Sequence, residues 1–141
     1  MICVTQEEMK KIDKLSCDIY TSIKLMYLAG NNMADIIIKN YSFKNVLAVV
    51  GKGGNAGDAI VVLNKLNSLG YNTAIYMVFD EITNSDSLFY LNDYKGNIID
   101  NLDNLNQYDL IIDGIFGIGL NKYLDDKTIN IINKLNNSNI R

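Results

Sequence analysis

Two glycine-rich stretches carry the side chains best suited to chemistry. The first, VVGKGGNAGDAIVVLNKL at residues 49–66, passes from an apolar run through glycines to Asn55 and Asp58. The second, YDLIIDGIFGIGLNKYL at residues 108–124, places Asp113 at the end of another apolar run, with glycines soon after it. Side-chain oxygens at a strand-to-helix turn can converge on a cation or a polar ligand, while backbone N–H groups there favour anions. Such a loop can therefore bind a phosphate and, through its oxygens, a hard cation.

The same residues also have a purely structural interpretation. Asp58 can cap the helix that follows, and Asn55 can occupy a left-handed turn. Asp113 can stabilise its own loop by accepting hydrogen bonds from nearby backbone amides, and Lys122 can be an ordinary solvated lysine. Spacing alone leaves both interpretations open.

The first stretch fits neither of the two best-known phosphate-binding loops. A Walker A loop requires G-x-x-x-x-G-K-[ST], but Lys52 stands inside the glycines and Asp58 follows Gly57. The Rossmann fingerprint G-x-G-x-x-G is nearly met as G-x-G-G-x-x-G. Asp80, at the end of the next predicted strand, resembles the acid that binds ribose in such domains. A plain Rossmann NAD-binding domain is therefore an alternative.

Composition removes several classes of protein. The 141 residues predict a single domain spanning 1–141, and the net charge of -3 without a basic cluster argues against nucleic-acid binding. Apolar runs too short for a bilayer and the lack of a signal peptide predict no membrane association and a cytoplasmic protein. Two cysteines, Cys3 and Cys17, are too few for a disulfide scaffold. The absence of His leaves carboxylates and Lys for proton transfer.

The elements that must position these residues alternate between strands and helices. Thr5 and Glu8 predict a capping box that starts a first helix, and Ser22 is expected to cap a second. The expected order then continues with strand 46–50, helix 58–69, strand 73–79, helix 86–94, strand 97–99, strand 109–113 and helix 126–135. This order predicts an α/β fold of Rossmann-like, three-layer α/β/α type, with a mostly parallel sheet preceded by two N-terminal helices. Both glycine stretches then fall at the carboxyl edge of the sheet, where ligands bind.

Three blocks of the sequence resemble the YjeF N-terminal family, the NAD(P)HX epimerases. The segment MKKIDKLSCDIYTSIKLMYLAG is similar to the family's opening helices, from a Met-x-x-x-Asp start to a Leu-Met-x-x-Ala-Gly end. The segment VGKGGNAGDAIVVLNKL resembles its V-G-x-G-N-N-G-G-D-G loop with the helix after it, and DLIIDGIFGIGL resembles its D-x-I-V-D-A-L-F-G-T-G-L block. The blocks occur in order over essentially the whole chain and favour the functional interpretation.

The resemblance implies an isomerase that repairs damaged nicotinamide nucleotides. Hydrated NADH and NADPH carry water on the nicotinamide ring as two C6 epimers, and the family interconverts the R and S forms. A dehydratase that uses ATP or ADP, fused or separate, then dehydrates the S form. Family members bind K+ near the substrate, and a homodimer is possible. A non-catalytic nucleotide-binding or dimerisation module of the same fold remains an alternative.

The resemblance also assigns site residues. The expected K+ ligands are Asn55 and Asp113. The expected substrate-binding residues are Gly54, Asn55, Ala56, Gly57, Asp58, Gly117, Ile118, Gly119, Leu120, Asn121, Lys122 and Tyr123. The sequence departs from the family where Gly54 replaces the first Asn of the Asn-Asn pair and where Ala56 and Ala59 replace glycines. These departures bear on substrate affinity more than on the fold.

The end of the chain departs further from the family. After the last helix the family continues with a strand and an Asp-x-Pro-Ser-Gly block, which supplies a substrate-binding Asp and a K+-ligating Ser. This chain ends in NNSNIR and contains no Pro. We therefore hypothesise that it is part of a longer protein, with the family's catalytic Asp beyond Arg141, and that alone it is a poor epimerase.

Overall fold

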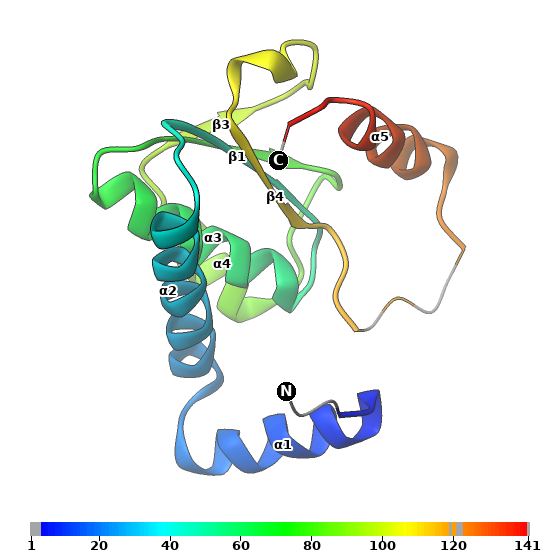
Figure 1. The fold of residues 1–141 in the computed structure, drawn as a ribbon. Helices are drawn as coiled ribbons and strands as arrows, with labels where there is room; N and C mark the ends of the chain where they lie inside the picture. Colours follow the sequence, from blue (N-terminus) through cyan, green and yellow to red (C-terminus); the bar gives the residue numbers. More distant parts are fainter. Residues whose placement is uncertain (1–3, 119, 121–122, 141) are drawn as a thin grey trace.

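Strands and helices alternate along the chain in the computed structural model, which describes residues 4–118, 120 and 123–140. Figure 1 shows the arrangement. The helices are α1 (Gln6–Ile19), α2 (Ser22–Asn40), α3 (Gly54–Ser68), α4 (Ser85–Asp93), the 3-10 turn η1 (Leu105–Gln107) and α5 (Asp126–Asn136). The strands are β1 (Asn45–Val50), β2 (Asn72–Met77), β3 (Asn97–Ile99) and β4 (Leu110–Gly114).

The strands form one parallel sheet in the order β3-β2-β1-β4. The end of β1 aligns with the ends of both its neighbours, because Val50 pairs with Met77 of β2 and with Gly114 of β4. The segments that follow these strands therefore leave from one edge of the sheet. Among the described residues, β4 pairs with β1 alone, and its other side carries no strand.

Helices cover both faces of this sheet. Figure 1 shows α2, α3 and α4 on one face and α5 on the other. Alternate residues of β1 face opposite ways: Val46, Ala48 and Val50 join the core under α3, while Leu47 and Val49 join the core that includes Ile131 of α5. The strand is buried on both faces, as its continuous apolar run predicts. The three-layer α/β/α fold with two preceding helices is confirmed.

The two N-terminal helices begin at hydroxyl caps. Thr5 and Glu8 form the predicted capping box, in which each side chain bonds the other residue's backbone N–H. The second cap was predicted wrongly: Thr21 caps α2 by accepting from the N–H of Lys24, and Ser22 is already helical. Both residues are hydroxyl-bearing and adjacent, so the sequence does not distinguish them.

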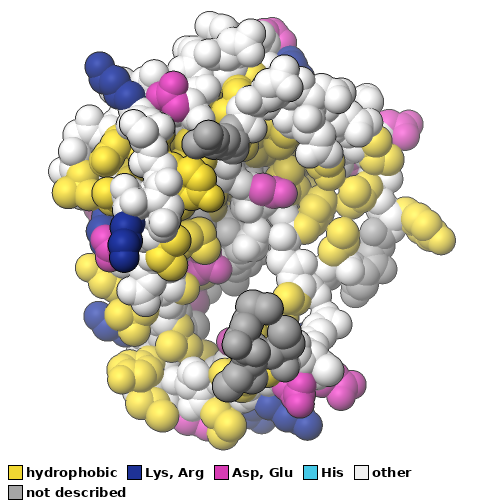
Figure 2. All heavy atoms as spheres, viewed as in Figure 1, with side chains coloured by type: hydrophobic (Ala, Val, Ile, Leu, Met, Phe, Trp, Pro, Cys, Tyr) yellow, Lys and Arg dark blue, Asp and Glu magenta, His cyan; other side chains and the backbone are white. Residues whose placement is uncertain are grey.

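Helix α1 lies apart from the sheet and contains no buried residue. Its apolar side chains are open, with Leu15 65% and Ile19 76% exposed. Figure 2 shows hydrophobic side chains on the surface over this helix. No helix within the described residues is long and apolar enough to cross a membrane.

The largest difference from the expected elements concerns the start of α3. The helix begins at Gly54 rather than at residue 58, with Gly53 as its N-cap in extended conformation. Asp58 therefore does not cap the helix, and no side chain does. Asn55 is helical rather than left-handed, since the single non-glycine residue with positive φ among those described is Asn139. The two structural roles considered for these residues, a helix cap at Asp58 and a left-handed turn at Asn55, are therefore wrong.

The backbone of Gly51 explains why a glycine must follow β1. Its N–H donates to the carbonyl of Gly114 at 3.0 Å, and a Cβ built on Gly51 would collide with the carbonyl oxygen of Ile115. At Gly54, by contrast, a Cβ would meet no atom within 4 Å. The first glycine is required by packing, and the second faces open space.

We predict opposite effects on stability for alanine at these two glycines. Gly51→Ala should lower the free energy of unfolding by about 1–3 kcal/mol because backbone must move to admit the methyl group. Gly54→Ala should leave it unchanged or raise it by up to about 1 kcal/mol, since alanine favours a helix more than glycine does. Urea denaturation of both variants measures this, and equal midpoints would contradict the role assigned to Gly51.

Candidate functional site

The turn between β1 and α3 is held from one side by the segment that enters α4. The carbonyl of Lys52 accepts hydrogen bonds from the backbone N–H groups of Thr83 at 3.1 Å and Asn84 at 3.2 Å. The carbonyl of Gly53 accepts from the hydroxyl of Ser87 at 3.0 Å. Because the N–H of a trans peptide points opposite to its C=O, the N–H groups of Gly53 and Gly54 point away from this segment. They stand at the start of a helix, where such groups attract anions.

A side chain of α3 ties this turn to the loop after β4. The amide nitrogen of Asn55 donates to the carbonyl of Phe116 at 2.9 Å. Gly117 lies close against the same side chain, since a Cβ built there would stand 3.4 Å from the Cβ of Asn55. The bond fixes the orientation of the amide, so its Oδ1 oxygen is turned away from Phe116.

Both glycine-rich segments line one cavity of about 750 Å³. Its described lining comprises Met9, Asp13, Lys52, Gly53, Gly54, Asn55, Asp58, Phe79, Ile115, Phe116, Gly117, Ile118, Leu120, Tyr123, Leu124, Asp125 and Thr128. Figure 2 shows the molecule hollowed between α1 and the sheet. Gln6 at the start of α1 bonds the carbonyl of Ile118, so α1 and the second loop meet at the rim. A volume of this order suits a small-molecule or cofactor site.

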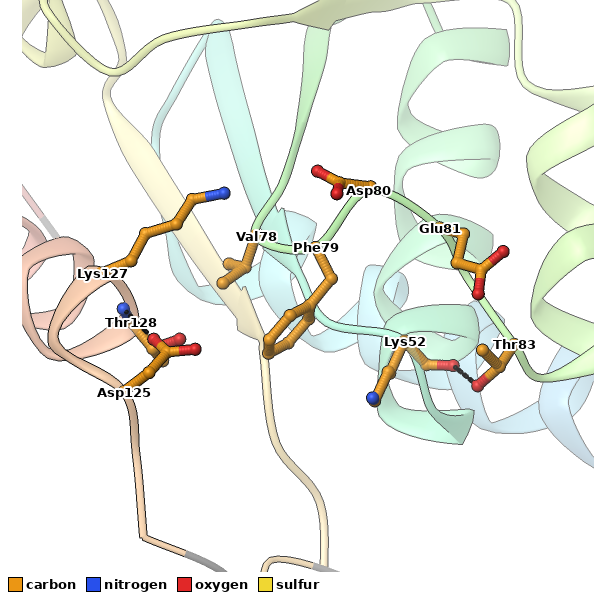
Figure 3. A pocket seen from close by; sticks show the side chains of 9 residues that line it. All are labelled: Lys52, Val78, Phe79, Asp80, Glu81, Thr83, Asp125, Lys127 and Thr128. Atoms are coloured by element: carbon orange, nitrogen blue, oxygen red, sulfur yellow. Dashed lines mark hydrogen bonds between the residues drawn. The ribbon is translucent and has the colours of Figure 1, made fainter.

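A second cavity of about 520 Å³ adjoins the first beyond the end of β2. Lys52, Phe79, Asp125 and Thr128 line both cavities. Figure 3 shows Phe79 at the centre of this second cavity, with Asp80 beside it. The ammonium group of Lys52 lies 5.4 Å from the centre of the Phe79 ring. Asp80 thus occupies the position after β2 that a ribose-binding acid takes in Rossmann domains.

The acids of the larger cavity differ in their environments. Asp125 caps α5 by accepting from the N–H of Thr128 at 2.7 Å, which holds the pKa of its carboxyl below the usual value. Asp58 is half-buried, and no hydrogen bond from a described residue stabilises its charge. Burial, and secondarily the negative charge of Asp13 on α1, raise the pKa of Asp58 to about 6. Asp58 can therefore hold or release a proton near neutral pH, whereas Asp125 stays ionised.

The structure places the expected substrate-binding residues unevenly. Those that line the cavity are Gly54, Asn55, Asp58, Gly117, Ile118, Leu120 and Tyr123. Ala56 is buried in the core, and Gly57 packs against Met26 and Ser87, where a Cβ would not fit. The other expected residues, Gly119, Asn121 and Lys122, lie outside the described residues.

The two expected K+ ligands do not share the cavity lining. Asn55 lines the cavity and has an amide oxygen turned away from Phe116. Asp113 is exposed, does not line the cavity, and accepts from the N–H of Ile115 at 2.9 Å. Amide and carboxylate oxygens are the donors that hard cations prefer, so the residue types fit such an ion. Within the described residues, no three or more His, Cys, Asp or Glu residues gather as a metal-binding group.

Several cavity residues were missed by the sequence analysis. Met9 and Asp13 come from α1, and they are the two fixed positions of the Met-x-x-x-Asp start already noted there. That motif was a signal available for both residues. Phe79, Phe116 and Thr128 carry no comparable signal, because an aromatic or hydroxyl side chain next to a strand or helix end is ordinary.

The chain is similar to known proteins over most of its length, including the turn at the start of α3 and the loop after β4. A model of the family described as "YjeF-related protein N-terminus" matches residues 22–141. The chain belongs to this family. The match includes α3 and the loop after β4, two of the segments that line the cavity, whereas α1 lies before the matched residues.

Several curated proteins are similar to this chain in sequence, and one solved structure is similar to it in fold. A protein of Oenococcus oeni named NAD(P)H-hydrate epimerase is 34% identical over 104 residues, which cover 71% of this chain and 50% of that protein. A bifunctional NAD(P)H-hydrate repair enzyme of Thermosynechococcus vestitus is 28% identical over 79% of this chain and 23% of its own length. The crystal structure of yeast YNL200c has a TM-score of 0.77 at 22% identity, covering 96% of this chain and 65% of that one. This chain spans about half the length of the curated epimerases that it matches first.

The environment of Asp58 predicts a pH-dependent stability. Because its folded pKa is raised to about 6, the folded state binds this proton more tightly than the unfolded state, where the pKa is 3.8. The stability that this protonated carboxyl contributes is fully present below the unfolded pKa and is lost as pH rises through about 6. Asp58→Asn should therefore gain on the order of 2 kcal/mol over the native chain at pH 7 and little at pH 4. Urea unfolding at both pH values measures this, with Asp93→Asn on the outside of α4 as control.

Proposed function

We propose that this chain is the nucleotide-binding part of an NAD(P)H-hydrate epimerase. The observation that carries the proposal is the convergence of the α3 turn and the loop after β4 on one cavity, within a chain of this family. Curated relatives bear the epimerase name. The substrate would be hydrated NADH or NADPH, and the reaction would exchange the R and S configurations at C6 of the nicotinamide ring.

The substrate would place a phosphate at the start of α3. The N–H groups of Gly53 and Gly54 are turned away from α4 and stand where the helix dipole is positive. The lack of a side chain at Gly54 leaves room for close approach of a phosphate oxygen. The nicotinamide ring would then lie in the larger cavity between Asp58 and the Phe116–Gly117 segment. The second cavity, which shares Phe79 and Lys52, would take the adenosine half, with Asp80 accepting from a ribose hydroxyl.

A potassium ion would complete this arrangement. Asn55 offers an amide oxygen at the cavity wall, and Asp113 offers a carboxylate at the end of β4. The ion would supply positive charge beside the oxygens of the bound nucleotide. Because Asp113 does not line the cavity as described, Asn55 is the ligand that the geometry supports better.

The same proposal implies a partner enzyme, a cellular location and an oligomeric state. The S epimer would pass to an ADP- or ATP-dependent dehydratase, and the bifunctional relative supports a fused or separate partner of that kind. We also propose a cytoplasmic location, where this coenzyme pool is used, and a possible homodimer. The alternative, a non-catalytic module of the same fold, would keep the cavity without accelerating epimerisation.

Epimerase activity is tested directly with the (R) epimer. The full chain, added to purified (R)-NADPHX in potassium buffer, should produce the S epimer faster than the spontaneous reaction. Gly54→Ala should weaken this acceleration without loss of stability, since its methyl group occupies space assigned to a phosphate. Chromatographic separation of the epimers over time measures both. An intact, folded chain with no acceleration would leave either an incomplete site or the non-catalytic module, and the same assay on a chain extended past Arg141 would choose between them.

The role of potassium is tested by two matched asparagines of α3. Asn55 and Asn64 each donate one hydrogen bond to a backbone carbonyl, at 2.9 and 3.0 Å, but only Asn55 lines the larger cavity as described. Asn55→Ala and Asn64→Ala should each lose about 1 kcal/mol of stability. With NADP+ present, replacing sodium by potassium should raise the melting temperature of the native chain and of Asn64→Ala, and leave Asn55→Ala unchanged. A potassium effect of equal size in both variants would remove Asn55 from the proposed site.

A further inference from the structure

The carbonyl groups that precede α3 receive more hydrogen bonds than the helix itself supplies. The carbonyl of Gly53 accepts from the N–H of Ala56 at 3.2 Å, an ordinary bond of a first helical turn. It also accepts from the hydroxyl of Ser87, on α4, at 3.0 Å. The carbonyl of Lys52 accepts from the hydroxyl of Thr83 at 3.2 Å, as Figure 3 shows, in addition to two backbone N–H groups. The segment that enters α4 therefore holds two consecutive carbonyls of the turn.

The start of α3 differs from the starts of the other α-helices in where its additional bonds fall. At α1, α2, α4 and α5 the side chain of the N-cap residue accepts a hydrogen bond from a backbone N–H of the first turn. At α3 the N-cap is Gly53, and no described side chain accepts in that way. A helix start lacks partners for its N–H groups and not for its carbonyls, so the bond from Ser87 does not replace a missing cap. Its effect is to fix the direction of the peptide group between Gly53 and Gly54.

That direction turns the N–H of Gly54 toward the larger cavity. In a trans peptide the N–H and the C=O lie on opposite sides, and the carbonyl of Gly53 faces Ser87. Gly53 and Gly54 line the cavity, whereas Ser87 is fully buried and does not line it as described. The N–H of Gly54 makes no backbone hydrogen bond among the described residues. The hydroxyl thus acts on the side of the turn opposite to the cavity.

Gly57 leaves room for this hydroxyl. A Cβ built on Gly57 would stand 2.5 Å from the Oγ of Ser87 and closer still to the Sδ of Met26. The sulfur belongs to a flexible side chain that can shift, whereas the hydroxyl is held by its hydrogen bond to Gly53. Gly57 itself does not line the cavity as described. The structure therefore connects Gly57 to the turn through Ser87, although the family resemblance assigns Gly57 to substrate binding.

We propose that Ser87 is a positioning residue for the nucleotide, which holds the peptide between Gly53 and Gly54 so that its N–H faces a phosphate of the substrate. Gly57 contributes by admitting the hydroxyl of Ser87. This inference rests on the proposed function and deepens it. Neither Ser87 nor Gly57 touches the substrate in this arrangement. A donor that is already oriented loses less freedom when the ligand binds, so the affinity is higher.

The variant Ser87→Ala isolates this bond because α4 keeps its own cap. Asn84 caps α4 by accepting from the backbone N–H of Ser87 at 2.9 Å, and alanine retains that N–H. The hydroxyl also lies 3.0 Å from the Oδ1 of Asn84, so its single hydrogen is shared between Asn84 and the carbonyl of Gly53. Ser87→Ala removes the bonds of the hydroxyl and leaves the cap bond in place.

A matched control removes another buried hydroxyl bonded at a similar distance. Tyr94, the C-cap of α4, donates from its hydroxyl to the Oγ1 of Thr73 at 2.9 Å. Both residues are buried, and neither lines the larger cavity as described. Tyr94→Phe should therefore lower the urea midpoint about as much as Ser87→Ala does, without changing the turn before α3.

The test titrates NADP+ into the full chain labelled with nitrogen-15, in potassium buffer, and follows the amide signals of Gly53 and Gly54 by NMR. Both signals of the native chain should move, because phosphate oxygens accept from these N–H groups. Ser87→Ala should weaken binding about 5- to 10-fold, which corresponds to one net hydrogen bond. Tyr94→Phe should bind as the native chain does. If Ser87→Ala binds within twofold of the native chain, the inference is wrong and the proposed function stands.

A second measurement asks whether Gly57 acts through Ser87 or touches the ligand. Gly57→Ala should weaken NADP+ binding about as much as Ser87→Ala, and the chain with both changes should bind no more weakly than either, since both affect one bond. Losses that multiply would place Gly57 against the ligand and overturn its assigned role. Urea unfolding shows whether each variant is folded, and if Gly57→Ala is not, the result for Ser87→Ala decides.

The native chain alone separates this inference from the proposed function. If the Gly53 and Gly54 signals stay unchanged with NADP+ while the chain accelerates epimerisation, the positioning role is overturned and the epimerase function stands. If the signals stay unchanged and neither this chain nor one extended past Arg141 accelerates epimerisation, both are overturned.

Discussion

The contact between the backbones of Gly51 and Ile115 sets the geometry on which the site depends. Because the N–H of Gly51 reaches the carbonyl of Gly114, the turn after β1 and the loop after β4 leave the sheet side by side. The bond from Asn55 to Phe116 then joins α3 to that loop one turn farther out. Asn55 and Phe116 are 61 residues apart in the chain. The segments that contain them thereby become walls of a single cavity.

Acids in this molecule separate into those with backbone partners and those without. Asp109 accepts from the N–H groups of Lys44 and Asn45, each at 2.8 Å, and joins the starts of β4 and β1. Asp125 likewise accepts from a backbone N–H, that of Thr128, at the start of α5. The pKa of each carboxyl is lowered by these bonds. Asp58 has burial without such a partner, which opposes ionisation and weakens the fold at neutral pH. Hydrogen bonds stabilise the charged form of Asp109 and Asp125, whereas burial destabilises the charged form of Asp58. Ionisable groups at functional sites are often in such an unfavourable environment.

Much of the fold follows from pattern, and the exceptions have physical causes. The apolar run at β1 and the alternation of elements predict the parallel sheet, because a strand covered on both faces has no polar side. The start of α3 was placed too late, because glycines are typical of loops and the hydrogen bonds from Thr83 and Ser87 that shape this turn come from far along the chain. The 3-10 turn η1 has no clear apolar period and was not predicted.

The site was predictable in part for similar reasons. Residue type and spacing drew attention to Asn55 and Asp58, and the family resemblance assigned both of them and Gly117 to the site; all three line the cavity. Asp13 was seen only as part of a motif, since nothing local in α1 indicates which of its acids turns inward. Its place depends on how the exposed helix α1 is held, and that is decided by contacts between distant segments, such as the bond of Gln6 to the carbonyl of Ile118.

Helix α5 forms a wall of the cavity and yet is held by a small part of its surface. Its buried residues are Thr128 and Ile131, whereas α3 is buried along most of its length. The free energy of local opening should therefore be low for α5 and high for α3 and β1. Opening of α5 would carry Asp125 and Thr128 away from the cavity while the α3 turn stays formed. A ligand that touches both walls would couple them, so that occupancy of the cavity slows amide exchange along α5 more than along α3.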